Sequence, residues 1–114
     1  MKTFTKVMKA LSDPNRVKIV KMLQHKAMCV CEIQEALSIS QSSVSKHLRI
    51  LGEADIVDYR KDGLWVNYYL SDGNKSPYVS SMMGNLRHWL NDDPDVADLI
   101  EKLPSIRREE ICGR

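Results

Sequence analysis

Hydrophobic residues near the start of the chain recur with the spacing of one helix face. They follow one another at intervals of three and four residues: Phe4, Val7, Met8 and Leu11. This spacing predicts a helix over residues 3–11 with a single apolar stripe.

A second helix is expected to begin at Pro14. Asp13 can cap it by accepting a backbone N–H hydrogen bond, and proline suits the first helical position. Val17, Val20 and Leu23 then share the buried face.

Two further helices are predicted on either side of a short break. The spacing of Val30, Ile33 and Leu37 indicates the third helix. Ser40 can cap a fourth, which runs to about Ala54. Two helices joined by so short a turn form a candidate helix-turn-helix.

A β-hairpin is predicted directly after the fourth helix. Residues 56–60 and 64–70 are rich in β-branched and aromatic side chains. Asp62 and Gly63 between them are typical of a tight turn. A hairpin that directly follows the second helix of a helix-turn-helix is the order expected of the wing in a winged helix-turn-helix.

The C-terminal third is expected to be helical again. Six hydrophobic residues carry the pattern of a fifth helix: Val79, Met82, Met83, Leu86, Trp89 and Leu90. A shorter sixth helix is predicted around residues 96–103. We interpret the methionine-bearing stripe of the fifth helix as a subunit interface.

The length and composition fit one compact domain. The chain has 114 residues, of which 43% are hydrophobic. We expect residues 1–103 to form a single DNA-binding and dimerisation domain and residues 104–114 to form a flexible tail. The expected fold class is mainly α with a small β-hairpin.

Neither a membrane span nor a signal peptide is predicted. No apolar run approaches the roughly 18 residues that a span requires, and the N-terminus lacks a basic start followed by an apolar core. We therefore expect a cytoplasmic protein without a membrane partner.

Basic residues are concentrated at the N-terminal end, although the formal net charge is only +2. Residues 1–26 contain seven Lys or Arg against Asp13 alone. Such a segment fits either a solvated helix face or an anion-binding surface, so charge by itself does not decide the function.

The start of the fourth helix suits contact with DNA. Four of residues 40–45 are serine, a middling helix former, which favours a functional reason for them. Small hydroxyl and amide side chains there could reach base edges, and the candidates are Gln41, Ser42, Ser43 and Ser45. Candidates for phosphate, guanine or minor-groove contacts are Lys46, His47 and Arg49 on the helix and Arg60 and Lys61 on the wing. A packed or capping role is the alternative for His47.

Cys29 and Cys31 are the candidate ligand pair. They are separated only by Val30, and a reducing cytoplasm would keep them as thiols. Thiolates select soft or borderline ions such as Zn(II), Cu(I) and As(III). Residues i and i+2 of a regular helix point about 200° apart, so chelation should open the first turn of the third helix. Two small buried cysteines at a helix start are the structural alternative.

Four segments together closely resemble the arsenical-resistance (ArsR) family of metal-sensing repressors: residues 11–16, 29–33, 41–48 and 63–70. The resemblance covers about residues 4–71. It implies a winged helix-turn-helix homodimer paired through its first and last long helices and bound to double-stranded operator DNA of two-fold symmetry. The implied inducer is As(III) or Sb(III) on Cys29 and Cys31, and no cofactor is required.

The chain departs from the family pattern at a few positions. Asp55 stands where glycine is usual, and Gly52 stands where a longer residue is usual, but aspartate tolerates a left-handed turn. Gln34 occupies the position where arsenite-sensing relatives most often have a third cysteine. Cys112 in the tail is therefore a candidate third ligand.

Other functions use the same inventory of residues. Cadmium and lead sensors of the family add cysteines from an N-terminal extension, and residues 1–28 contain none. Zinc sensors use Asp and His pairs on the last helix, where His88 is the only histidine.

A thiol-redox switch at the cysteine pair stays open, as does a sensor of another thiophilic metal. An enzyme is not expected, because no nucleophile with a general base and no phosphate loop is evident. Salt-dependent DNA binding would separate these readings from a protein-interaction module.

Overall fold

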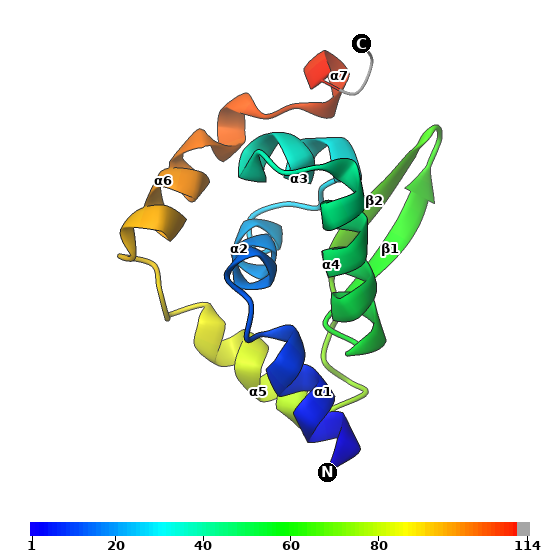
Figure 1. The fold of residues 1–114 in the computed structure, drawn as a ribbon, viewed down its shortest axis with the longest axis vertical. Helices are drawn as coiled ribbons and strands as arrows, with labels where there is room; N and C mark the ends of the chain where they lie inside the picture. Colours follow the sequence, from blue (N-terminus) through cyan, green and yellow to red (C-terminus); the bar gives the residue numbers. More distant parts are fainter. Residues whose placement is uncertain (112–114) are drawn as a thin grey trace.

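The computed structural model describes residues 1–111, which form helices around one two-stranded antiparallel sheet (Figure 1). The first half contains α1 (Lys2–Ala10), α2 (Pro14–Leu23), α3 (Val30–Leu37) and α4 (Gln41–Glu53). The second half contains β1 (Val57–Asp62), β2 (Trp65–Leu70), α5 (Pro77–Leu86), α6 (Pro94–Lys102), the 3-10 turn η1 (Leu103–Ser105) and α7 (Arg108–Ile111). The predicted fold class, mainly α with a small hairpin in the order of a winged helix-turn-helix, is confirmed.

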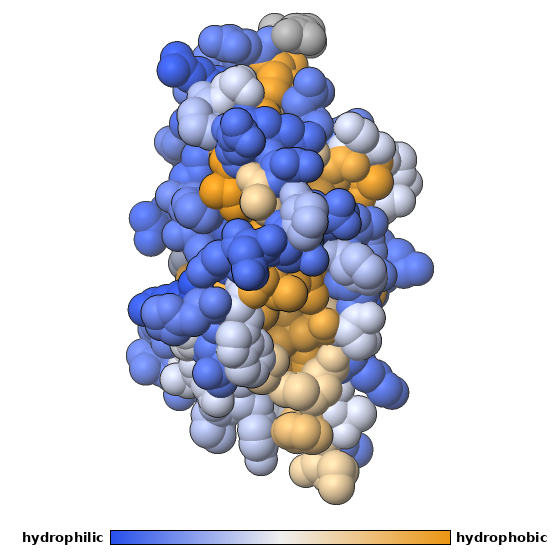
Figure 2. Space-filling model, turned by 90° about the vertical axis from the view of Figure 1, so that its left-hand side faces the viewer, coloured by the Kyte–Doolittle hydropathy of each residue, from blue (hydrophilic) through white to orange (hydrophobic). Residues whose placement is uncertain are grey.

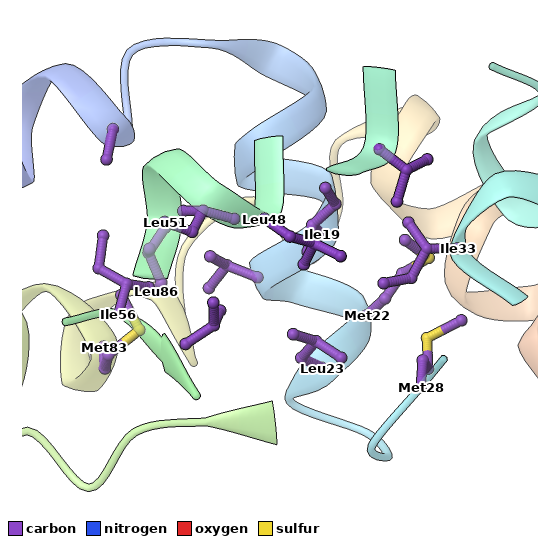
Figure 3. Packing of buried hydrophobic residues seen from close by; sticks show 14 of the residues in the cluster. Ile19, Met22, Leu23, Met28, Ile33, Leu48, Leu51, Ile56, Met83 and Leu86 are labelled. Carbon is purple, nitrogen blue, oxygen red and sulfur yellow. The ribbon is translucent and has the colours of Figure 1, made fainter. Parts of the chain in front are cut away.

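The core lies around α2, which the other elements surround (Figure 1). Ile19 and Met22 of α2 are fully buried, and Figure 3 shows them between Leu48 of α4 and Ile33 of α3. Helix α4, the candidate recognition helix, therefore rests on the same apolar cluster as α3, so a displacement of α3 would change the packing of α4.

The expected helix caps are present. The Asp13 carboxylate accepts the Arg16 N–H at 3.1 Å, and the Ser40 hydroxyl accepts the Ser43 N–H at 3.2 Å. Each satisfies one of the backbone donors that a helix start leaves unpaired. Asp55 has a φ of +60°, as expected for an aspartate in a left-handed turn.

The hairpin turn lies one residue later than predicted. Asp62 pairs with Trp65 in the strand register, so the two turn residues are Gly63 and Leu64. Gly63 has a φ of +63°, whereas Leu64 is not among the residues with positive φ. Glycine as the first turn residue is typical of a II′ hairpin, which accommodates this arrangement.

The helix α5 is shorter than predicted. We expected the helical pattern to reach Trp89 and Leu90, but α5 ends at Leu86, and these two side chains are 50% and 42% exposed. The ammonium of buried Lys21 accounts for the stop, because it donates to the Leu86 and Trp89 carbonyls and to the Asn91 amide oxygen. Burial lowers the pKa of Lys21, which reflects the cost of holding its charge away from water.

Replacing Lys21 with methionine is expected to lower the free energy of unfolding by about 1–3 kcal/mol. Methionine fills similar space but donates no hydrogen bond, so the carbonyls at the end of α5 lose their donor. Urea unfolding followed by circular dichroism measures the change. Lys18→Met, on the same helix, is the control and should change stability by less than about 0.5 kcal/mol. Equal stability of Lys21→Met and the parent protein would contradict this role.

The segment after α6 folds back onto the molecule. We expected residues from 104 onward to be a flexible tail, yet Ile106 is only 5% exposed and belongs to the core. The domain boundary after residue 103 stays a prediction, but residues 104–111 pack as part of the same body, and α7 contacts α3.

Helices α1 and α5 lie side by side and leave apolar side chains uncovered (Figure 1). The rings of Phe4 and Tyr78 meet edge to face with centroids 5.3 Å apart, and Phe4 is 43% exposed. Figure 2 shows hydrophobic residues gathered on this end of the molecule. Part of the stripe that we assigned to a subunit interface, Val79 and Met83, is instead buried within the single chain. None of the helices among the described residues is long and apolar enough to cross a membrane.

Candidate DNA-binding surface and cysteine site

The polar face of α4 is open to solvent. The exposed candidates on it are Gln41, Ser42, Ser45, Lys46 and Arg49. Ser43 is half-buried, and its hydroxyl oxygen accepts a hydrogen bond from the Ser40 hydroxyl at 3.0 Å, so it also belongs to the helix cap. The structure brings the small side chains together at the first turn of α4. Their contacts with bases stay predictions.

His47 links the recognition helix to the rest of the domain. Its Nδ1 atom lies 3.2 Å from Nη1 of Arg16, whose Nε donates to the Ala10 carbonyl at 2.7 Å. Because arginine only donates, Nδ1 acts as the acceptor. The pKa of His47 is lowered first by burial, and Arg16 and Lys46 lower it further against the opposing effect of Asp13. A neutral His47 therefore fixes α4 against α2, whether or not it also reaches DNA.

The wing presents the two predicted basic residues. Arg60 and Lys61 are exposed near the end of β1, and the Arg60 guanidinium stacks 5.6 Å from the centre of the Tyr69 ring. The hairpin runs beside α4, and its tip lies toward the end where α4 begins (Figure 1). The tip of the wing and the first turn of α4 thus lie at the same end of the molecule (Figure 1).

Cys29 lies at the cap of α3 and not inside the helix. Its backbone is extended, with φ −87° and ψ 170°, and its residue exposure is 3%. The Glu32 carboxylate accepts the Cys29 N–H at 3.0 Å and completes a capping box. Our expectation that both cysteines follow helical geometry is therefore wrong, since only Cys31 lies within α3. A ligand on both sulfurs would act on the cap itself.

Cys31 opens into a cavity of about 440 Å³ on the outer side of α3. Gln34 lines the same cavity, because residues three apart share a helix face. Ile111 lines it from α7. The candidate ligand Cys112 lies outside the described residues. Both described cysteines are reduced thiols, and within residues 1–111 no three His, Cys, Asp or Glu side chains are grouped to hold a metal ion.

Sequence reasoning missed three further residues, two at the cysteine site and one at the wing. Glu32 is buried and caps Cys29, while Lys26 lies 3.8 Å from the other Glu32 oxygen. Arg108 of α7 contacts the hairpin, 2.8 Å from Asp62. The spacing of Cys29 and Glu32 is that of a capping box with cysteine at the first position, which could have revealed Glu32. No local signal connects residue 108 to the wing.

Comparison with known proteins shows which family shares this sequence and this fold. The model for the arsR family of bacterial regulatory proteins matches residues 13–59. The arsenic resistance transcriptional regulator ArsR1 of Pseudomonas putida is 34% identical over 100 residues, which are 83% of this chain and 76% of that protein. The cadmium resistance regulatory protein CadC homolog of Staphylococcus aureus is 44% identical over 68 residues, or 59% of this chain and 56% of that protein. Among solved structures, HlyU from Vibrio cholerae has a TM-score of 0.64 at 31% identity and covers 75% of this chain and 89% of that one. The chain therefore belongs to the ArsR family and is a DNA-binding transcriptional regulator, not an enzyme.

Proposed function

We propose that this protein is a homodimeric repressor that leaves its operator when As(III) or Sb(III) binds Cys29 and Cys31, with Cys112 as the candidate third thiolate. The observation that carries the proposal is the position of the cysteine pair at the start of α3, the helix that packs against the recognition helix α4. The relationship to an arsenic resistance regulator supports the choice of inducer.

The chemistry of the pair suits a thiophilic metalloid. Each cysteine thiol replaces one hydroxide of arsenous acid, the thiol proton leaves with that hydroxide as water, and no electron is transferred. The sulfur atoms are the soft ligands that such a centre prefers. The cavity beside Cys31 gives a metalloid access to this thiol, and Ile111 at its edge directly precedes Cys112 in the sequence.

Binding at the cap would weaken DNA binding through α3. The Cys29 N–H bond to Glu32 holds the first turn of α3 in place. A metalloid that draws the two sulfurs together competes with this cap and shifts α3 against α4. Because coupling between sites is reciprocal, operator DNA should weaken arsenite binding by the same factor.

Release of DNA by arsenite tests the proposal. Reduced protein is bound to a fluorescent duplex from its own promoter, and anisotropy is followed while arsenite, antimonite, cadmium or zinc is added. We expect arsenite and antimonite to release the duplex and Cys29→Ser or Cys31→Ser to abolish the release. Ser38→Ala, which alters the rim of the same cavity without touching a thiol, is the matched control and should respond as the parent protein does.

The other outcomes identify the alternatives. Release by cadmium alone would make the protein a sensor of a different thiophilic metal, as the name of the Staphylococcus relative suggests for that protein. Release by peroxide without any metal would favour a thiol-redox switch. Release that is unaffected by either serine substitution would remove the cysteine pair from the mechanism.

A further inference from the structure

We propose that residues 103–111, the C-terminal strap, connect the cysteine site to the wing, and that Arg108 positions the wing for DNA binding. The inference rests on the proposed function, because it concerns how a ligand on the cysteines reaches the DNA-binding surface. It assigns to the strap a coupling role in addition to the packing of α3 against α4.

The inner end of the strap is tied to the cap of α3. The Lys26 ammonium donates to the Ile106 carbonyl at 2.7 Å and to the Leu103 carbonyl at 3.3 Å. The same ammonium lies 3.8 Å from Oε2 of Glu32, whose Oε1 accepts the Cys29 N–H. A continuous series of polar contacts therefore runs from the backbone of Cys29 to the backbone of the strap.

The outer end of the strap is tied to the wing through Arg108. Its Nη2 lies 2.8 Å from Asp62 Oδ2, and its Nη1 donates to Asn67 Oδ1 at 3.0 Å. Its guanidinium also stacks 4.4 Å from the centre of the Trp65 ring. The side chain is only 22% exposed, and it contacts both strands of the hairpin close to the turn. A planar guanidinium that is stacked and paired in this way fixes the orientation of its partners.

A change at the cap of α3 can reach Arg108 through the strap. Arg108 lies two residues after Ile106, whose carbonyl accepts a hydrogen bond from the Lys26 ammonium, and this ammonium lies beside Glu32. Metalloid binding displaces Cys29 and the Glu32 cap together. The strap then moves at its inner end, and Arg108 leaves the wing.

The turn that Arg108 holds directly follows the wing residues that are predicted to meet DNA. Asp62 is the next residue after Arg60 and Lys61. An unanchored hairpin would present these two cations in many orientations. Operator affinity would therefore fall in the arsenite-bound state through the wing, in addition to the effect of α3 on α4.

The test follows Trp65 in a Trp89→Phe background, where it is the only tryptophan. Arg108→Gln is compared with Arg107→Gln, which removes the same charge from the neighbouring exposed residue. We expect arsenite to shift the Trp65 emission of the parent and of Arg107→Gln. Arg108→Gln should show a shifted emission already without arsenite and little further change.

The decisive quantity is the ratio of operator affinities without and with arsenite. Couplings of this kind span about 5- to 150-fold, and we expect Arg108→Gln to reduce the ratio about tenfold. A direct contact of Arg108 with DNA, or a purely structural role, would lower both affinities and leave the ratio unchanged, which would overturn the inference. If the parent protein itself keeps its DNA in arsenite, the proposed function fails. If the parent releases DNA and Arg108→Gln releases it equally, only the role of the strap fails.

Discussion

Replacing Phe4 with aspartate is expected to convert the protein to a monomer and to weaken operator binding by about 100-fold or more. Phe4 projects from α1 beside Tyr78 of α5, at the apolar end of the molecule. A second copy of the chain that covers this end would bury both rings, and a carboxylate there would lose its hydration. In the proposed dimer each protomer would contribute one recognition helix, so a monomer would lose the gain that comes from binding two half-sites at once.

Thr3→Asp provides the matched control for this substitution. Thr3 is exposed on the same helix and lies about 100° away from Phe4 around its axis. It introduces the same charge outside the apolar stripe and should leave a dimer with the parent affinity. Sedimentation equilibrium gives the mass, and anisotropy gives the affinity. A dimeric Phe4→Asp variant with unchanged affinity would show that the subunits pair through another surface.

The parts of the fold that local chemistry determines were predictable. Asp13 and Ser40 cap their helices as expected, because a short acceptor before a run of helical spacing has few other uses. The hairpin was displaced by one residue, since glycine suits either turn position and only the pairing of Asp62 with Trp65 decides between them.

Contacts between distant segments account for what the sequence did not reveal. Lys21 ends α5 from a place more than sixty residues earlier in the chain, which no periodicity within α5 could indicate. The fold-back of Ile106 and Arg108 likewise depends on Lys26 between α2 and α3, on α3 and on the wing. The cysteine pair was found from its chemistry, but the position of Cys29 at the cap and not inside the helix depends on Glu32.

Replacing Gln34 with cysteine is expected to make the protein respond at an arsenite concentration at least about tenfold lower, which corresponds to about 1.4 kcal/mol of added binding free energy. Gln34 lies three residues after Cys31 and lines the same cavity, so a thiol there would face the same ligand. A sulfur at residue 34 would take the third position on arsenic in place of Cys112 or of the last hydroxide, without a new cost of bringing the ion to the site. The measurement is the arsenite concentration that releases half of the labelled operator.

Two further variants decide whether the added thiol acts together with the natural pair. Gln34→Ser removes the amide without adding a sulfur and should leave the half-release concentration near that of the parent. The double variant Gln34→Cys with Cys31→Ser should lose the gain, because the two sulfurs bind the same ion and their effects are not additive. An unchanged response of Gln34→Cys would mean that arsenic does not enter the cavity beside Cys31. In that case the metalloid would have to meet Cys29 from another side of the α3 cap, where Glu32 and Lys26 lie.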